Sequence, residues 1–448
     1  MIDRRVPAPN SLAAKPPLAE EVDMPAAFFV LPTHRSGPLG RAARLLATAC
    51  LTLALGMSGG PDARAQGASP PSGPARTPLA AGPMVAAGEG TSFLLKGDGT
   101  VWSWGDQRDG RLGDGQDRDN SRTQPRPVLG LSAIRQIAIG AAHGLALRAD
   151  GTVLAWGANG DGRLGNGRDS GAEPTAIPVP GLAGVVAVAA GVASSMALRQ
   201  DGVVLTWGQN GAGQLGLGDD ASRSVPTPLP ALANVRAIAA GGGQAFAIRR
   251  DGVVFAWGNN RDGQLGLGIL AGGGYVRSPR IVDALNGANT VAIAAGYFHT
   301  VALLADGSLR TFGASNTGQA GTPTGVDGFG AFPSPIRPAG VDSVTAVAAG
   351  QYHTLALRRD GSALSWGNAS EGRLGDGTSG RSQSSSLPGH VSVDGIVAIA
   401  AGERHSLVIV RDGTVGCFGS NFLGQCAQSQ GYVEVILPTA VPGVNALQ

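Results

Sequence analysis

The sequence is poor in charged residues, in aromatic residues and in cysteine. Only 15% of its 448 residues are Asp, Glu, Lys or Arg, 5% are Phe, Trp or Tyr, and three are Cys. Three cysteines are too few for a disulfide-dense scaffold or for a zinc site made of four thiolates. The chain has instead 72 Gly and 29 Pro, a turn-rich composition that argues against an all-helical protein.

Neither sign of charge is in excess. The chain has 34 Lys and Arg against 32 Asp and Glu, and residues 1–65 hold seven of the basic and five of the acidic residues. The remaining residues are therefore balanced, with 27 of each sign. Proteins that bind nucleic acid present a concentrated basic surface to the phosphate backbone, so the sequence predicts no nucleic-acid partner.

An apolar run at residues 45–57 follows Arg41 and Arg44 and precedes small residues that end at Ala65. This order is typical of a cleaved secretory signal, and the run is short for a membrane-spanning helix. Residues 1–65 are therefore predicted to be a signal peptide with a long polar flank, an uncleaved anchor being the alternative. Residues 66–82 are interpreted as a Pro/Gly/Ser-rich linker. We expect the mature chain in the periplasm or outside the cell, with no membrane span after cleavage.

The rest of the chain repeats one unit seven times. An Asp-Gly pair is followed six residues later by an aromatic-Gly pair, and successive copies are 50 to 55 residues apart. The Asp residues of these pairs are Asp98, Asp150, Asp201, Asp251, Asp306, Asp360 and Asp412. A period of this length that recurs along the chain indicates a repeat architecture.

Each unit contains short apolar runs of strand length, such as residues 252–257 and 300–304. Asp-Gly between two such runs favours a tight hairpin, because Gly tolerates the positive φ of a two-residue turn. Four strands per unit, repeated radially, predict an all-β protein: a closed seven-bladed β-propeller of four-stranded antiparallel blades over residues 83–448. The chain ends on the tail of a unit and the first repeat starts in mid-strand, so we expect both terminal segments in one blade.

The unit also resembles a known repeat. Residues 348–357 (AAGQYHTLAL) and 257–266 (WGNNRDGQLG) are similar to the two halves of the regulator of chromosome condensation repeat. The resemblance covers essentially all of residues 83–448 and implies a seven-bladed propeller, here of an exported bacterial type. The family includes a nuclear exchange factor for a small GTPase, a plant ultraviolet-B photoreceptor and secreted bacterial proteins that bind β-lactamases, so it implies no single function.

Four histidines occupy one position of the repeat: His143, His299, His353 and His405. Thr91, Ser194 and Gln244 stand at that position in the other units, so a polar hydrogen-bonding side chain suffices there. We interpret the histidines as structural residues that bridge turns, since metal ligands on four separate blades would not converge. No catalytic, cofactor-binding or metal-binding set of residues stands out, and no cofactor is expected.

These observations favour an exported monomer that binds another protein and has no catalytic activity. The alternative is an exported enzyme or carbohydrate-binding protein with its site in the variable loops, and an exchange factor for a small GTPase is less favoured. Turns alternate between faces, so the variable loops and the A-G-x-x-H turns should share one face. The candidate binding patch there consists of Tyr275, Tyr297, Phe298, Phe329, Phe332 and Tyr352.

Cys417 and Cys426 both lie in the last unit; at the position of Cys426, five of the other six units have Leu and the sixth has Ala320. Their joint occurrence in one unit of an exported protein predicts a disulfide between them. Two separately buried thiols are the alternative.

Overall fold

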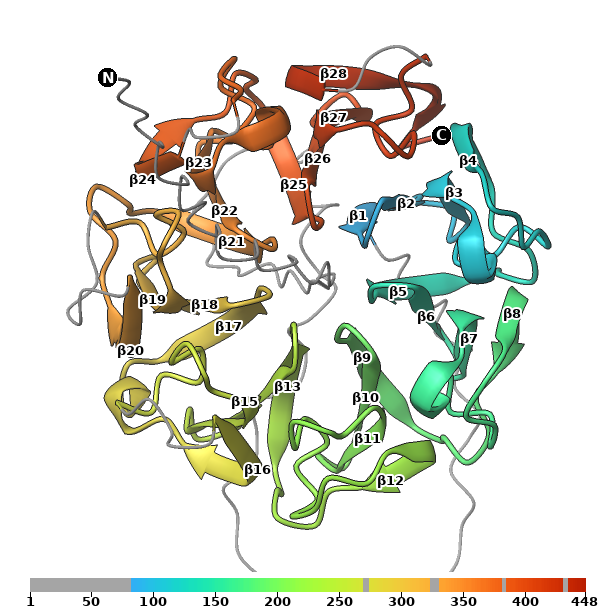
Figure 1. Cartoon of the computed structure of the whole chain (residues 1–448), viewed down its shortest axis with the longest axis vertical. Helices are drawn as coiled ribbons and strands as arrows, with labels where there is room; N and C mark the ends of the chain where they lie inside the picture. The colour runs from blue at the N-terminus through green and yellow to red at the C-terminus, as the bar shows by residue number, and fades with distance from the viewer. Residues whose placement is uncertain (1–81, 269–273, 323–329, 381–383, 430–433) are drawn as a thin grey trace, which may run out of the picture.

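The chain forms seven antiparallel sheets of four strands each, which surround a common axis in a computed structural model (Figure 1). The structure describes residues 82–268, 274–322, 330–380, 384–429 and 434–448. The predicted signal peptide and nearly all of the predicted linker lie outside these residues. The expected seven-bladed propeller of four-stranded blades is thereby confirmed.

Each blade is one continuous stretch of the chain, with its strands in sequence order. The strands of blades one to four are β1 (Met84–Ala87), β2 (Thr91–Leu95), β3 (Val101–Asp106) and β4 (Ser121–Pro127); β5 (Ile134–Ile139), β6 (His143–Arg148), β7 (Val153–Ala158) and β8 (Ala172–Pro178); β9 (Val185–Ala190), β10 (Ser194–Arg199), β11 (Val204–Gly208) and β12 (Arg223–Pro228); β13 (Val235–Ala240), β14 (Gln244–Arg249), β15 (Val254–Asn259) and β16 (Tyr275–Ile281).

The strands of blades five to seven are β17 (Thr290–Ala295), β18 (His299–Leu304), β19 (Leu309–Ala314) and β20 (Ala331–Ile336); β21 (Val344–Ala349), β22 (His353–Arg358), β23 (Ala363–Asn368) and β24 (Ser384–His390); β25 (Ile396–Ala401), β26 (His405–Val410), β27 (Thr414–Ser420) and β28 (Glu434–Asn445). Short 3-10 turns are η1 (Arg108–Gly110), η2 (Gly160–Gly162), η3 (Asp283–Leu285) and η4 (Ser370–Gly372). The described residues contain no α-helix, and so no helix able to cross a membrane.

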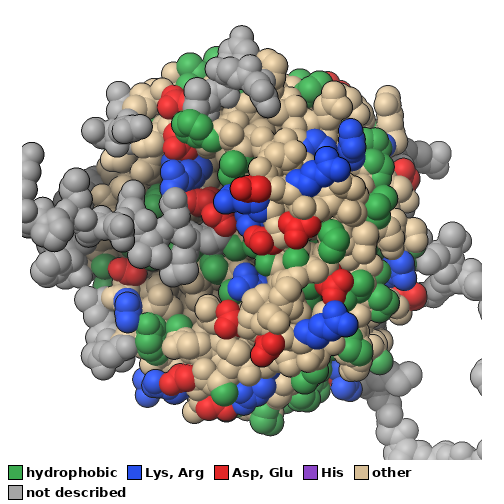
Figure 2. Space-filling view, turned by 45° about the vertical axis from the view of Figure 1, so that its right-hand side comes forward, with side chains coloured by type: hydrophobic (Ala, Val, Ile, Leu, Met, Phe, Trp, Pro, Cys, Tyr) green, Lys and Arg blue, Asp and Glu red, His purple; other side chains and the backbone are tan. Residues whose placement is uncertain are grey.

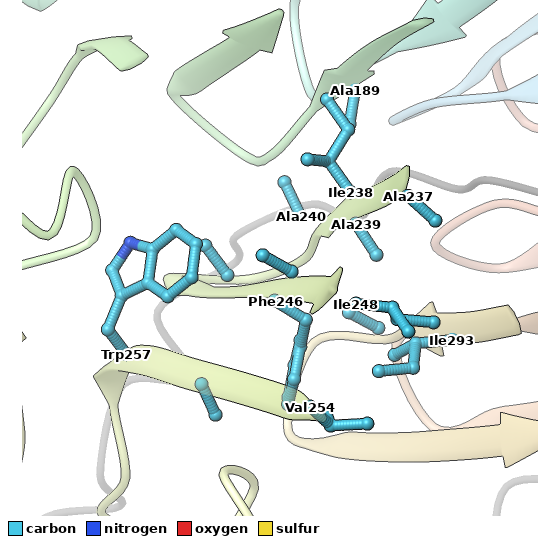
Figure 3. Close-up of a cluster of buried hydrophobic side chains, with 14 of the residues drawn as sticks. Ala189, Ala237, Ile238, Ala239, Ala240, Phe246, Ile248, Val254, Trp257 and Ile293 are labelled. Atoms are coloured by element: carbon cyan, nitrogen blue, oxygen red, sulfur yellow. The ribbon is translucent and has the colours of Figure 1, made fainter. Parts of the chain in front are cut away.

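The core lies between neighbouring blades. Ala189 of β9, Phe246 of β14 and Ile293 of β17 belong to one buried cluster that joins blades three, four and five (Figure 3). Trp257 lies in the same cluster and is fully buried, and its Nε1 donates to the carbonyl of Gln214 in the preceding blade at 3.0 Å. A buried indole N–H needs such an acceptor. The repeated Trp therefore serves both as a core residue and as a link between blades.

Small residues are required where the inner strands end. A Cβ added to Gly88 would lie 2.5 Å from the carbonyl oxygen of Gly140, and one added to Gly140 would lie 2.5 Å from that of Gly191. The same contact recurs around the ring, down to Gly402, whose Cβ would lie 2.9 Å from the carbonyl oxygen of Gly88. The Gly at the end of each inner strand is therefore needed because the neighbouring backbone occupies the space of a side chain. We call these seven residues the glycine ring: Gly88, Gly140, Gly191, Gly241, Gly296, Gly350 and Gly402.

Replacing a member of the glycine ring should destabilise the fold. In Gly241→Ala the new methyl would lie 2.4 Å from the carbonyl oxygen of Gly296, so two blades must separate. We expect a loss of about 2 to 3 kcal/mol in the free energy of unfolding, as for overpacked cores. Gly211→Ala is the matched control, because nothing lies within 4 Å of its added Cβ. Chemical denaturation of both variants checks this, and equal stabilities would contradict it.

The expectation that both terminal segments share a blade was wrong. Blade one consists of β1 to β4 and blade seven of β25 to β28, so neither borrows a strand from the other end of the chain. The four-residue β1 is short, but it pairs with β2 as a complete inner strand, with Met84 opposite Leu95. The two blades instead meet side by side. The backbone N–H of Glu403 donates to the carbonyl of Gly88 at 3.4 Å, and that of Gly97 to Ala446 at 3.1 Å.

Candidate functional site

One face of the ring carries the seven turns that connect the first and second strands of each blade, four of which end in the repeat His. Backbone hydrogen bonds tie the ends of the third strands to these turns, as from Ala314 N–H to the carbonyl of Phe298 at 2.8 Å. The loops that lead into the variable segments therefore start on this face, as the alternation of turns predicts. We call it the turn face.

The turns are also bonded to one another around the axis. Ala141 N–H donates to the carbonyl of Val192 at 3.4 Å, Val192 N–H to Gly241 at 3.2 Å and Tyr297 N–H to Gly350 at 3.3 Å. Each donor belongs to the turn of one blade and each acceptor to the turn of the next. The centre of the turn face is therefore a connected backbone surface, on which side chains of different blades are held at fixed relative positions.

The four repeat histidines are buried between blades. His143 Nε2 lies 3.0 Å from Ser195 Oγ of the next blade, and that hydroxyl donates to the carbonyl of Arg163 at 2.8 Å. The equivalent pairs are His299 with Thr354 at 2.8 Å, His353 with Ser406 at 2.9 Å and His405 with Ser92 at 2.8 Å. The histidines thus have a structural role, although they bridge neighbouring blades rather than turns. No group of three His, Cys, Asp or Glu within the described ranges is arranged to hold a metal ion.

Burial keeps these imidazoles neutral. It lowers the pKa of His143, His299 and His405 to about 3, and that of His353 well below its usual 6.5. Nearby guanidinium groups act in the same direction, that of Arg163 on His143 and that of Arg373 on His353 and His405. A neutral, inaccessible imidazole whose Nε2 is already bonded is suited to connecting blades.

Three of the six candidate aromatic residues come together on the turn face. The rings of Tyr297 and Phe298 have centroids 4.6 Å apart, and those of Phe298 and Tyr352 are stacked at 5.3 Å. Phe298 and Tyr352 are half-buried, whereas Tyr297 is only 3% exposed. We call these three residues the aromatic stack. It joins the turns of blades five and six. Val192 of blade three packs against the buried hydrophobic cluster that includes Tyr297.

The other three candidates do not join the aromatic stack. Tyr275 begins β16, where its ring lies 5.0 Å from the guanidinium of Arg261. Phe332 is only 6% exposed on β20, so it is a packing residue rather than a surface residue. Phe329 lies outside the described residues. The described members of the predicted set thus divide into the aromatic stack, with two half-buried rings and one buried ring, and two residues outside it.

Sequence reasoning missed a group of charged residues in the loops and turns of blades six, seven and one. Arg404 of blade seven lies 3.6 Å from Glu371 of blade six and 2.9 Å from Glu403. In blade one, Arg111 lies 3.6 Å from Glu89. We call these five residues the charged arc. They come from loops and turns of three different units, so only the fold brings them together.

The charged arc contains side chains of both signs. Acidic and basic side chains are also intermixed over the surface that Figure 2 shows. The view shows no large area of one sign. A surface of this kind is suited to a partner that presents complementary charges of both signs.

The two cysteines lie next to each other in blade seven, with a disulfide between them and Cα atoms 5.2 Å apart. Four other blades have a hydroxyl at the position of Cys417 that donates to the carbonyl at the position of Cys426, as from Ser103 to Leu112 at 2.7 Å. The neighbouring carbonyl of Gln425 accepts from Trp104 Nε1 of blade one at 2.8 Å. The cysteine pair therefore stands at the junction of the last and first blades. Its oxidation in the cell stays a prediction.

The disulfide should contribute measurably to stability. The double variant Cys417→Ser/Cys426→Leu has the same two residues as Ser103 and Leu112 of blade one. A hydrogen bond from the new Ser hydroxyl to the carbonyl of residue 426 can therefore replace the covalent bond, as it does between Ser103 and Leu112. Loss of a loop closure this short should cost about 3 kcal/mol. Denaturation of the oxidised wild type should therefore become easier with reductant, while the double variant should not respond. Two alkylatable thiols in denatured, non-reduced protein lacking residues 1–65 would contradict the bond.

A family model described as the RCC1-like domain matches residues 52–328 of the chain. The chain belongs to the RCC1-like domain family. Two further models, both of the regulator of chromosome condensation (RCC1) repeat, match residues 344–373 and 396–425, and residues 306–357 and 360–409. The resemblance noted from the repeat unit is thus confirmed.

Two curated relatives, one human and one from a plant, show how much of the chain is shared. The chain is 32% identical over 329 residues to human E3 ubiquitin-protein ligase HERC2. The matched region covers 72% of this chain and 7% of the ligase. It is 30% identical over 301 residues to the ultraviolet-B receptor UVR8 of Arabidopsis thaliana, 66% of each protein. The chain therefore spans a small part of the ligase and about two thirds of the receptor. The expected bacterial-type, exported character is not shown by these relatives.

Solved structures show the same architecture. Prp20p of Saccharomyces cerevisiae, whose structure was described together with its binding to Gsp1p and histones, is 26% identical with a TM-score of 0.66. The match covers 77% of this chain and 85% of that one. Human WBSCR16 is 23% identical with a TM-score of 0.67, and the match covers 77% of this chain and 94% of the WBSCR16 chain. At this identity the likeness supports the fold alone.

Proposed function

We propose that this chain is an exported propeller that binds another protein through its turn face, as a monomer and without catalysing a reaction. The observation that carries the proposal is that the aromatic stack, in turns of blades five and six, and the charged arc, in loops and turns of blades six, seven and one, lie on the same face. Aromatic and arginine side chains are the residues that contribute most to protein interfaces. The family relationship adds support, because Prp20p is described as binding Gsp1p and histones.

The backbone of the turn face suits such a role. Its turns are hydrogen-bonded to one another around the axis, so binding would order few additional groups. A preformed surface retains more of its interaction energy as affinity than a flexible one does. The buried histidines do not take part, because each is already hydrogen-bonded to a neighbouring blade.

The proposal is tested with one substitution on each face. Arg404→Glu reverses a charge in the charged arc, and Arg250→Glu makes the same change at an exposed position of the β14–β15 hairpin on the opposite face. Immobilised wild type, Arg404→Glu and Arg250→Glu are compared for proteins captured from envelope and medium fractions. A partner held by wild type and Arg250→Glu but lost with Arg404→Glu supports the turn face. Identical capture by all three contradicts it.

Export is tested separately. Amino-terminal sequencing of protein from envelope and medium fractions should give a mature start near Gln66. Full-length protein in the membrane fraction would favour the uncleaved anchor, and full-length protein confined to the cytosol would refute export.

A further inference from the structure

One acidic residue of the turn face lacks the counter-charge that its equivalents have. In three loops that follow third strands, an acid pairs with an Arg two residues later: Asp109 with Arg111 at 2.8 Å, Asp161 with Arg163 at 3.7 Å and Glu371 with Arg373 at 3.4 Å. In blade four the acid is Asp262, and the residue two positions later is Gln264. The Gln264 side chain only accepts the backbone N–H of Asp262, at 2.9 Å.

Asp262 is also removed from much of the solvent. Its side chain is half-buried, and none of the hydrogen bonds or ion pairs found among the described residues involves its carboxylate. Burial raises the pKa of this carboxyl, and the charge of neighbouring Arg261 opposes that effect only in part. The guanidinium of Arg261 lies over the ring of Tyr275. The folded chain therefore leaves a partly desolvated negative charge without a partner of its own.

The repeat places Asp262 beside the aromatic stack. The equivalent residue of blade five, Thr317, reaches the carbonyl of Tyr352 in the next blade's turn at 3.4 Å. The equivalent residue of blade six, Glu371, reaches Arg404 in the turn that follows. By the same register, position 262 of blade four lies next to the turn of blade five that carries Phe298. This agrees with Gly313, whose added Cβ would lie 2.5 Å from the Phe298 carbonyl oxygen and 3.1 Å from the Gln264 Cα.

We propose that Asp262, Phe298 and Tyr352 form a site for a cationic side chain, Lys or Arg, of the protein partner. The carboxylate supplies the opposite charge, and the partly exposed rings supply the negative faces to which cations are attracted. The arrangement complements a cation in both charge and shape, because the aromatic rings cover the alkyl part of such a side chain. This inference rests on the proposed protein-binding function and assigns chemistry to one part of its surface.

The test uses small probes, so that it does not depend on finding the partner. The full chain is prepared with 4-fluorophenylalanine at position 298, and its fluorine resonance is followed by NMR. The probes are acetylated, amidated pentapeptides Gly-Ser-X-Ser-Gly, in which X is Lys, Arg or norleucine. The Lys and Arg peptides should shift the resonance in a saturable manner, and the norleucine peptide should not. Equal shifts with norleucine, or no shift with either cation up to the solubility limit, would overturn the site.

Asp262→Asn should weaken binding of the Lys peptide about fivefold, in the range of partly exposed charge pairs and cation–π contacts. Asp161→Asn is the matched control, because it removes the equivalent acid of another blade and should leave the affinity unchanged. Thermal unfolding checks that both variants fold, and Asp262→Asn should not lower stability because it removes a desolvated charge. Equal affinities of the two variants would overturn the role of Asp262. If the partner is captured through the turn face but the peptides do not bind, only this inference fails; if the peptides bind but capture ignores Arg404→Glu, only the proposed function fails.

Discussion

Lowering the pH from 7 to 5 should destabilise this protein by about 2 kcal/mol for each buried histidine whose pKa is held near 3, or about 6 kcal/mol for His143, His299 and His405 together. Stability falls at lower pH because the unfolded chain binds more protons than the folded chain. The unfolded chain takes up protons near pH 6.5, while the folded chain keeps these imidazoles neutral. The contribution of these neutral histidines to the free energy of unfolding is therefore fully present above about pH 6.5 and is lost progressively as the pH falls toward 3. Denaturant titrations at pH 7 and pH 5 measure the difference.

His143→Gln supplies the control for this acid sensitivity. Gln is accommodated at the same repeat position by blade four, where Gln244 Nε2 donates to the carbonyl of Gly296 at 2.8 Å. The variant should lose about one third of the pH-dependent destabilisation assigned to the three histidines, since one titrating group is removed. A pH dependence identical to that of the wild type would show that His143 does not contribute.

Deleting residues 435–448 should destabilise the ring by about 5 kcal/mol or more. The deletion removes nearly all of β28 with the buried Val435 and Val441, removes the buried Ala446 that follows it, and leaves β27 as an open edge. It also removes the hydrogen bond from Gly97 N–H of blade one to Ala446. Because blade seven contacts both blade six and blade one, we expect the whole unfolding transition to move to lower temperature. Differential scanning calorimetry measures this shift.

Removal of the last two residues alone is the control for this truncation. Leu447 and Gln448 are exposed and lie beyond β28, so their loss should leave the transition within about 0.5 kcal/mol of wild type. An unchanged transition after the longer deletion would show that blade seven frays independently of the ring.

The fold was predictable because one unit recurs seven times. Each Asp-Gly pair and each Ala-Ala-Gly segment indicates the same turn or inner strand, so an error in one unit is corrected by the others. The shared blade was predicted wrongly because that prediction depended on where the repeat starts and ends, which the other units do not check. A four-residue strand still completes a sheet when the next strand supplies its hydrogen bonds, as β2 does.

The candidate site was less predictable, because its residues are the ones that depart from the repeat. The charged arc combines residues from units far apart in the sequence, and nothing in a single unit places Glu371 near Arg404. The aromatic stack was predicted in part, since Phe298 and Tyr352 share one repeat position in adjacent units. The lone charge of Asp262 did have a sequence signal. Three units carry an acid followed two residues later by Arg, and this unit carries Gln264 instead.

Each sheet is made from one uninterrupted segment of the chain, so the chain ends could be moved to another connection between blades without dividing a sheet. Met84 pairs with Leu95, and Gly97 is bonded to Ala446, so the first and last described segments lie close together. A circularly permuted chain, joined there by a short linker and opened in the connection between β4 and β5, would keep all seven sheets whole. Such a permutant would start with blade two and end with blade one, and the turn face would be presented unchanged.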